Sequence, residues 1–259
     1  MADSSSTSSG ETALLLGATG AVGSEVLSSL IASPHYTTIH SFVRKPSSTP
    51  SSSDSKVIEH VVDFEKLCEG DASQVEKFIE VKADSVLIAL GTTRAAAGGA
   101  KPFERIDREY VLAAAKAARV EGGKPQKVVY CSAQMADSTS RFLYPKSKGL
   151  TEEGLSSLGY SDVILFRPGF LYGAQRAQPR RLEHFYGLLT HNVLSKISDS
   201  AEIPTSVLGK CMVEAVRMGA EGLKSKGIGS KPSGAALAGG AGSVVVIDNG
   251  QALKMGKTL

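Results

Sequence analysis

Three evenly spaced glycines follow a short apolar run near the start of the chain, and they constrain its fold more than any other feature. The apolar run covers residues 13–16, the glycines are Gly17, Gly20 and Gly23, and apolar residues then recur at helical spacing as far as Ile31. A strand, a tight turn and a helix in this order can bind a dinucleotide, because glycines let the backbone approach a pyrophosphate at the helix N-terminus. A turn of small residues without a ligand is the alternative, and the flanking strand and helix favour binding.

The rest of the chain alternates apolar runs with amphipathic stretches, which predicts an α/β fold. Right-handed crossovers between parallel strands place helices on both faces, so we expect a doubly wound parallel sheet, the NAD(P)-binding Rossmann fold. We expect residues 12–259 to form a single domain after a disordered serine-rich tail at residues 1–11. Further strands are predicted at 37–43, 57–62, 85–90, 127–131, 162–166 and 244–247, and further helices at 72–81, 103–120 and 144–158.

The last third of the chain, from about residue 170 to residue 259, is predicted to be a small, mostly helical region on the substrate side of the cleft. Glycine, serine, lysine and alanine dominate residues 225–242, which predicts a flexible insertion. One stretch has the pattern of an amphipathic helix that either docks on lipid or packs in the core. Its residues are Arg180, Arg181, Leu182, Phe185 and Leu188.

Composition excludes several classes of protein. The 259 residues include 29 basic and 26 acidic side chains, a balance that gives no reason to expect a nucleic-acid partner. The three cysteines are far apart and form no Cys-x-x-Cys pair, so we expect neither a disulfide framework nor a metal site. No apolar stretch approaches the roughly 18 residues that span a bilayer. The N-terminal segment resembles neither a secretory signal nor a mitochondrial presequence.

The residues that end the second strand favour NADP over NAD. NAD-binding members of this fold have an acidic residue here, which accepts hydrogen bonds from the adenosine ribose. This chain has Arg44 and Lys45 instead. A guanidinium can bind a 2′-phosphate through charge and a fork of donors, so we predict that Arg44 contacts the 2′-phosphate. The alternative is that both are solvated loop charges.

Two later strand ends add candidate cofactor residues. Asp63 follows the third strand and could accept from the adenine amino group, although aspartate is equally common there as a turn former. Leu90, Gly91 and Thr92 end the fourth strand, at the edge where parallel sheets bind ligands. A glycine at this place lets the backbone approach a cofactor. An ordinary strand-to-loop turn is the alternative.

Ser132, Tyr144 and Lys148 are the candidate catalytic residues. Tyr144 and Lys148 are four residues apart, so a helix places them on one face. An ammonium beside a phenol stabilises the phenolate, which lets tyrosine act as a general acid or base. Ser132 ends the preceding strand, where its hydroxyl could bind the same substrate oxygen. The Tyr-x-x-x-Lys spacing is common by chance, and a surface helix pair is the alternative; its position after the fifth strand favours an oxidoreductase site.

Several motifs together make residues 12–222, with the last strand, similar to the atypical short-chain dehydrogenases/reductases. Among these the chain resembles the fungal "found in mitochondrial proteome" proteins, relatives of the animal oxidoreductase that interacts with the viral Tat protein. It departs from the pattern at Cys131, where serine is usual, at Pro145, and in the insertion at 225–242. The motifs are 17–23 (GATGAVG), 89–99 (ALGTTRAAAGG), 144–149 (Tyr-x-x-x-Lys-Gly) and 165–169 (LFRPG).

The resemblance implies an NADPH-binding enzyme that acts on a carbonyl or alcohol substrate, with Ser132, Tyr144 and Lys148 at the catalytic positions. It also implies peripheral attachment to the cytosolic face of the mitochondrial outer membrane, which composition does not show. The alternatives are a cytoplasmic location and a non-catalytic NADPH-binding regulator that acts through protein partners. The candidate cofactor residues are Gly17, Thr19, Gly20, Ala21, Val22, Gly23, Arg44, Asp63, Leu90, Gly91, Thr92, Lys148 and Arg167.

Overall fold

A computed structural model describes residues 10–47, 53–173, 202–232 and 242–259. Its centre is a sheet of seven parallel strands in the order β3-β2-β1-β4-β5-β6-β9. The chain adds β2 and β3 on one side of β1 and the later strands on the other, so β1 and β4 flank the switch point where such sheets bind ligands. The strands are β1 (Glu11–Leu16), β2 (Tyr36–Val43), β3 (Val57–Val61), β4 (Ser85–Ile88), β5 (Lys127–Cys131), β6 (Asp162–Arg167) and β9 (Ser243–Asp248).

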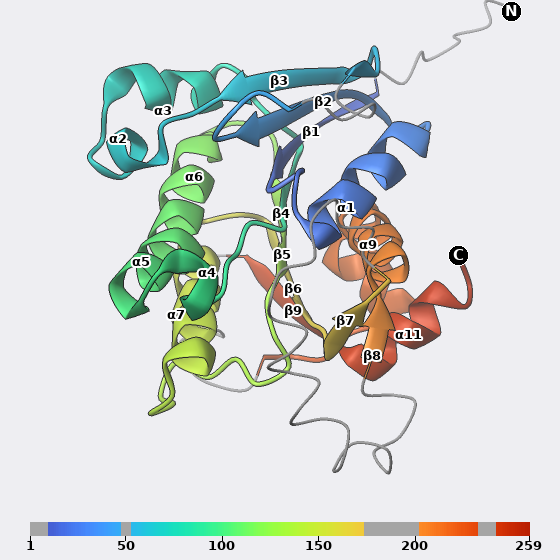
Figure 1. Ribbon diagram of the computed structural model, residues 1–259. Coiled ribbons are helices and arrows are strands. Elements are labelled where there is room, and N and C mark those ends of the chain that lie inside the picture. The colour runs from blue at the N-terminus through green and yellow to red at the C-terminus, as the bar shows by residue number, and fades with distance from the viewer. Residues whose placement is uncertain (1–9, 48–52, 174–201, 233–241) are drawn as a thin grey trace, which may run out of the picture.

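Helices cover both faces of this sheet, as the alternating pattern predicts (Figure 1). On one face lie α1 (Ala21–Ala32), α9 (Thr205–Ser225) and α11 (Asn249–Gly256). The other face carries α2 (Phe64–Cys68), α3 (Ala72–Ile79), α5 (Ala100–Glu104), α6 (Tyr110–Ala118) and α7 (Leu143–Ser157), with the short α4 (Arg94–Ala97) nearby. The doubly wound α/β prediction is therefore confirmed.

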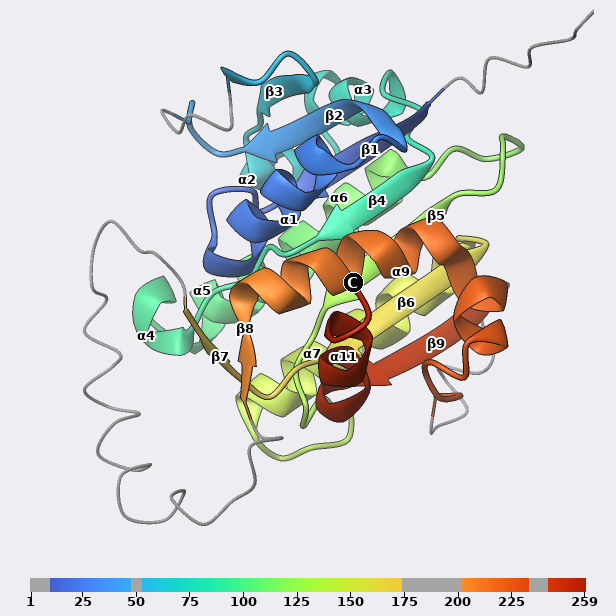
Figure 2. The ribbon, with the colours of Figure 1, turned by 90° about the vertical axis from the view of Figure 1, so that its right-hand side faces the viewer.

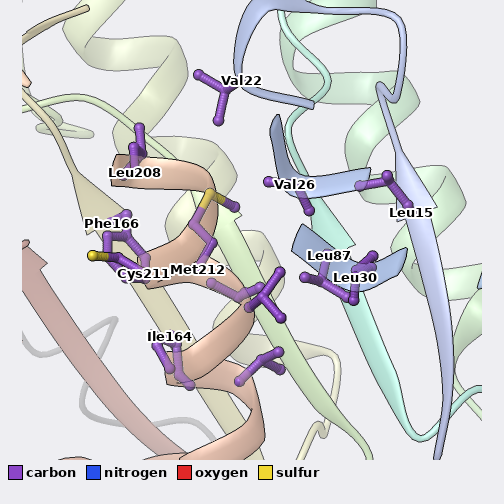
Figure 3. Close-up of a cluster of buried hydrophobic side chains, with 14 of the residues drawn as sticks. Leu15, Val22, Val26, Leu30, Leu87, Ile164, Phe166, Leu208, Cys211 and Met212 are labelled. Carbon is purple, nitrogen blue, oxygen red and sulfur yellow. The ribbon is translucent and has the colours of Figure 1, made fainter. Parts of the chain in front are cut away.

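The strands contribute side chains to two hydrophobic cores, one on each face of the sheet, because successive side chains point to opposite faces. In β1, Ala13 and Leu15 face α1 and α9, while Leu14 and Leu16 face α6. Figure 3 shows the first core, where Leu15 and Leu87 lie near Val26 of α1. All of these side chains are buried. This packing fixes the strand ends that carry the candidate site.

Helix α9 differs from the prediction that the C-terminal region lies on the substrate side. Leu208, Met212 and Val216 are fully buried against α1 and the sheet, so most of α9 belongs to the core (Figures 2 and 3). At Gly209 a Cβ would lie 2.8 Å from the backbone of Glu25, so the glycine lets α9 approach α1 closely. A two-stranded parallel sheet, β7 (Phe170–Tyr172) with β8 (Glu202–Pro204), was not predicted. The predicted amphipathic helix after Arg180 falls outside the described residues.

Two other predicted segments differ from the structure where they are described. The single helix expected at 103–120 is interrupted by a π-helical turn, η2 (Arg105–Glu109), between α5 and α6. Of the predicted insertion at 225–242, residues 233–241 lie outside the described part of the chain. In the described part Ser230 pairs with Val246 through a backbone hydrogen bond of 2.8 Å, so the segment around Ser230 is held against β9. The described residues contain no helix that is long and apolar enough to cross a membrane. Helices α2, α4 and α11 were not predicted.

Candidate dinucleotide and catalytic site

The predicted site residues follow the carboxyl ends of five neighbouring strands. Because all seven strands are parallel, these ends meet at one edge of the sheet. The glycine turn follows β1, the basic pair follows β2, Asp63 follows β3, the Leu90–Thr92 loop follows β4, and Ser132 follows β5. Residues that lie far apart in the sequence are therefore brought to a common edge.

The glycine turn has a shape that only glycine permits. Gly17 has φ of +90°, and a Cβ there would lie 2.6 Å from the backbone nitrogen of Leu90. A Cβ on Gly23 would lie 1.9 Å from the carbonyl oxygen of Gly17. The turn is closed by a 2.9 Å hydrogen bond from Gly20 N to Gly17 O. The glycines thus bring β1, the loop after β4 and α1 together at the switch point.

The N-terminus of α1 fits the phosphates of a dinucleotide. Its N-cap is Gly20, which has no side chain to accept from the first-turn N–H groups, and no acidic residue lies in that turn. A helix leaves the first-turn N–H groups, here those of Ala21, Val22 and Gly23, without an intrahelical acceptor, and its dipole favours an anion there. Thr19 is exposed at the turn. The turn offers backbone donors and no competing carboxylate.

A cavity of about 290 Å³ lies at the ends of β2 and β3. Arg44 lines it and is exposed, which suits a role toward a phosphate; Lys45 is exposed but does not line it. The Glu65 carboxylate at the cavity is paired with Arg105, whose Nη2 lies 2.7 Å away, so its charge is met by a neighbouring cation. The other lining residues are Val61, Val62, Asp63, Phe64 and Tyr110.

Asp63 caps a helix, a local role that differs from the turn considered from the sequence. It is the N-cap of α2, and its Oδ1 accepts from the N–H groups of Glu65 and Lys66 at 3.0 and 3.2 Å. The capping oxygen of Asp63 is already engaged by these two N–H groups. A contact between Asp63 and adenine stays a prediction. Asp63 nevertheless lines the same cavity as Arg44.

Tyr144 and Lys148 come together in the first half of α7. Lys148 Nζ lies 5.9 Å from the centroid of the Tyr144 ring. The two differ in exposure, because Tyr144 is 44% exposed and Lys148 only 4%. Pro145 is the third residue of α7, inside the first turn, where its missing N–H removes no helical hydrogen bond. The proline is therefore compatible with the expected helix.

The surroundings of Lys148 include two residues that the sequence analysis missed. Lys148 Nζ donates to Tyr130 Oη at 2.9 Å and lies 3.1 Å from Asp107 Oδ1. Burial works to lower the pKa of Lys148, but interactions with Tyr130, Asp107 and Tyr144 raise it well above its usual value. Asp107 is one of three carboxylates in the first turns of its predicted helix, with Glu104 and Glu109, so its place in the sequence does not single it out. Nothing local marks Tyr130.

Ser132 and Arg167 meet at a buried carboxylate. The Ser132 hydroxyl donates to Glu152 Oε1 at 2.5 Å. Arg167 donates to both oxygens of Glu152, at 3.0 Å from Nε and 2.6 Å from Nη2. A serine hydroxyl has a single proton to donate, so in this arrangement Ser132 can only accept from another partner. The roles of Ser132 toward substrate and of Arg167 toward cofactor stay predictions.

Cys131 replaces the usual serine without adding a reactive group. Its side chain packs against the first core, and burial raises the pKa of its thiol to about 11. Because the thiolate is the nucleophilic form, the raised pKa keeps the Cys131 thiol in its less reactive, protonated form at neutral pH.

Comparisons with known proteins agree with this architecture. The model of the NAD dependent epimerase/dehydratase family matches residues 13–211. Protein fmp52, mitochondrial, of Emericella nidulans is 35% identical over 207 residues, which are 78% of this chain and 85% of that protein. Protein FMP52, mitochondrial, of Candida albicans is 37% identical over 166 residues, which are 62% of this chain and 68% of that protein.

Solved structures share the fold at low sequence identity. The Bordetella bronchiseptica enzyme WbmH in complex with NAD+ has a TM-score of 0.59 at 12% identity, over 92% of this chain and 86% of that one. A short-chain dehydrogenase/reductase from Serratia marcescens has a TM-score of 0.59 at 13% identity, over 94% and 98%. The chain therefore belongs to the NAD dependent epimerase/dehydratase family, where it is a relative of the fungal fmp52 proteins with a fold of the short-chain dehydrogenase/reductase type.

Proposed function

We propose that this protein is an NADP-dependent oxidoreductase that moves hydride between a nicotinamide and a carbonyl or alcohol carbon. The observation that carries the proposal is the Tyr144–Lys148 pair at the edge where the glycine turn ends β1. Tyr144 is accessible to a substrate, while the Lys148 ammonium is buried beside it. This difference in exposure suits a proton donor supported by a fixed charge.

In the proposed mechanism the bound nicotinamide supplies or accepts the hydride, and the side chains manage the proton. The Tyr144 hydroxyl gives its proton to the carbonyl oxygen during reduction, and the Lys148 ammonium stabilises the phenolate that remains. Ser132 would orient the same oxygen. To donate to it, the Ser132 hydroxyl must turn away from Glu152, whose Oε1 accepts its hydrogen bond in the structure.

We infer a preference for NADPH from the cavity that Arg44 lines. Arg44 is exposed at the end of β2, and the carboxylate of Glu65 in the same cavity is paired with Arg105. A 2′-phosphate would therefore meet the exposed Arg44 guanidinium, while the Glu65 charge is met by Arg105 and one oxygen of Asp63 is engaged in capping α2. This arrangement favours the phosphate over a ribose hydroxyl.

Isothermal titration calorimetry with NADPH and with NADH tests the cofactor part of this proposal. We expect tighter binding of NADPH, followed by NADPH oxidation with members of a panel of aldehydes, ketones and quinones. If calorimetry detects no binding heat with either nucleotide, both the cofactor assignment and the enzyme assignment are overturned.

A second candidate function is that of an NADPH-binding regulator that acts through protein partners. It is favoured by the engagement of Ser132 with Glu152, which leaves the serine proton unavailable in the described arrangement. Turnover of NADPH with the panel of aldehydes, ketones and quinones distinguishes the two functions. Tight NADPH binding with no turnover on any member of the panel supports the regulator.

We propose a peripheral location on the cytosolic face of the mitochondrial outer membrane. The supporting observation is that the fungal relatives are named mitochondrial. Carbonate extraction and protease treatment of intact mitochondria test it. Release by carbonate and digestion by external protease are expected, whereas a protein found only in the cytoplasmic fraction would contradict the proposal.

A further inference from the structure

We propose that Asp107 is a positioning residue for this site, whose carboxylate keeps the buried Lys148 side chain protonated and fixes its ammonium beside Tyr144. The inference rests on the proposed function for its catalytic meaning. Its physical content, a charge held by a counter-ion, can be tested without substrate or cofactor.

The Asp107 carboxylate lies in direct contact with the Lys148 ammonium. Asp107 is fully buried, and its Oδ1 lies 3.1 Å from Lys148 Nζ. It belongs to η2, and π-helical turns are rare and occur frequently at functional sites. The pair joins η2 to α7, two elements that meet only through the tertiary fold. The ammonium is therefore held from the interior side of the site.

Asp107 also reaches the loop after β4 that is predicted to bind the cofactor. The backbone nitrogen of Thr92 lies 3.4 Å from Asp107 Oδ1. At Gly91 a Cβ would lie 3.1 Å from the same oxygen and 3.5 Å from Lys148 Nζ. A glycine thus lets this loop lie against the ion pair. One carboxylate oxygen links the loop and the lysine.

The charges around Lys148 single out Asp107 as its counter-ion. The groups that face the ammonium are Asp107 from η2, Tyr130 and Cys131 from β5, and Tyr144 from α7. Burial raises the pKa of the Tyr130 phenol and that of the Cys131 thiol, so neither is an anion at neutral pH. Without a nearby anion, a fully buried lysine loses several units of pKa and becomes neutral. Asp107 offsets that effect.

The hydrogen-bond capacity of the pair points the same way. An ammonium has three donors. Tyr130 and Asp107 each take one of those of Lys148, which leaves a third donor without a hydrogen-bond partner among the described residues. Within the described part of the chain, Asp107 Oδ2 is buried and has no hydrogen-bond partner. An unsatisfied buried oxygen is destabilising, so the carboxylate is not explained by stability alone.

The decisive experiment compares the protonation of Lys148 in the wild type and in Asp107→Asn. Lysine side chains labelled with ¹⁵N are titrated by NMR, and the Lys148 signal is assigned by its loss in Lys148→Met. We expect Lys148 to be protonated in the wild type at about pH 9, and the midpoint to fall by at least about one unit in Asp107→Asn. An unchanged midpoint would overturn the proposal, whatever the activity of the protein.

Asp162→Asn is the matched control. Asp162 begins β6 at the opposite end of the sheet, where its carboxylate accepts from the N–H of Ala220 at 3.1 Å. This substitution also removes one carboxylate that accepts a hydrogen bond, but it should leave the Lys148 midpoint unchanged. A similar shift in both variants would attribute the effect to general loosening and contradict the assignment.

Two further measurements separate this inference from the proposed function. If wild type shows no turnover while Asp107→Asn still shifts Lys148, the counter-ion assignment stands and the enzyme assignment fails. If turnover is present, Asp107→Asn should lose activity most strongly toward alkaline pH, and Asp107→Glu should restore part of it. Should Asp107→Asn not fold, the double variant with Lys148→Met must fold, because it removes both buried charges. Failure of the double variant would overturn the proposal.

Discussion

Arg167 and Glu152 form a bidentate ion pair in which the carboxylate is fully buried and the guanidinium is 18% exposed. The pair links β6 to α7 one turn beyond Lys148, and Ser132 adds a third hydrogen bond to it. The Glu152 charge is thus met by groups of the protein itself. Arg167 therefore has a structural role that does not depend on a cofactor.

Arg167→Leu should destabilise the protein rather than act first on cofactor affinity. It leaves the Glu152 carboxylate buried without its cation, which lowers the free energy of unfolding by about 3–5 kcal/mol. Urea unfolding measures the loss, and Arg167→Leu combined with Glu152→Gln should recover most of it. A variant of wild-type stability that binds NADPH weakly would instead assign Arg167 to the cofactor.

Tyr144→Phe should abolish most turnover and leave NADPH affinity nearly intact. The substitution removes only the hydroxyl that exchanges the proton, and such groups contribute roughly 100- to 10,000-fold to rate. Steady-state kinetics and calorimetry on the same preparation measure both quantities. Retained turnover in this variant would count decisively against the proposed mechanism.

Arg44→Ala should weaken NADPH binding by about 10- to 100-fold, because hydrogen bonds to charged groups contribute roughly 1.5–3 kcal/mol. The affinity for NADH should change little, since NADH has no 2′-phosphate. Lys45→Ala is the matched control, because Lys45 is the exposed neighbour that does not line the cavity. Equal losses for both nucleotides in Arg44→Ala would contradict a 2′-phosphate contact.

Gly23→Ala should lower stability and cofactor affinity together. The Cβ of the alanine would lie 1.9 Å from Gly17 O, so the turn must open. This lowers the free energy of unfolding by about 1–3 kcal/mol. Gly250→Ala is the control, because it also substitutes a glycine in the first turn of a helix, where the nearest atom would be 3.4 Å away. Thermal unfolding with and without NADPH measures both effects. Identical behaviour of the two variants would remove the argument for close packing.

Stability should fall as the solution is acidified below about pH 6.5, the ordinary pKa of histidine. His40 Nδ1 lies 2.8 Å from His60 Nε2, and burial lowers the pKa of both rings in the folded state. The unfolded chain therefore binds protons first, so this contribution is present above the unfolded pKa and is lost as pH falls. Melting temperatures across this range should fall less steeply in His60→Gln. Equal slopes would contradict it, and the slopes above about pH 7.5, where both rings are neutral, serve as the control.

Local patterns were enough to predict the glycine turn, the parallel strands and the helix that carries Tyr144 and Lys148. These features depend on side-chain periodicity and on conformations that only glycine adopts, which neighbouring residues define. Short elements such as α2 and β7 were missed because they have too few residues to show a period. The position of α9 could not be predicted either, because a helix with an apolar face packs equally well on a core or beside a cleft.

The sequence by itself determined which residues end the strands, and hence that a dinucleotide edge would form where β1 meets β4. Only the tertiary structure decided the partners of the buried charges. Asp107 meets Lys148, and Glu152 meets Ser132 and Arg167, because separate elements pack together there. A buried charge requires a partner, but nothing local in the sequence specifies which residue supplies it.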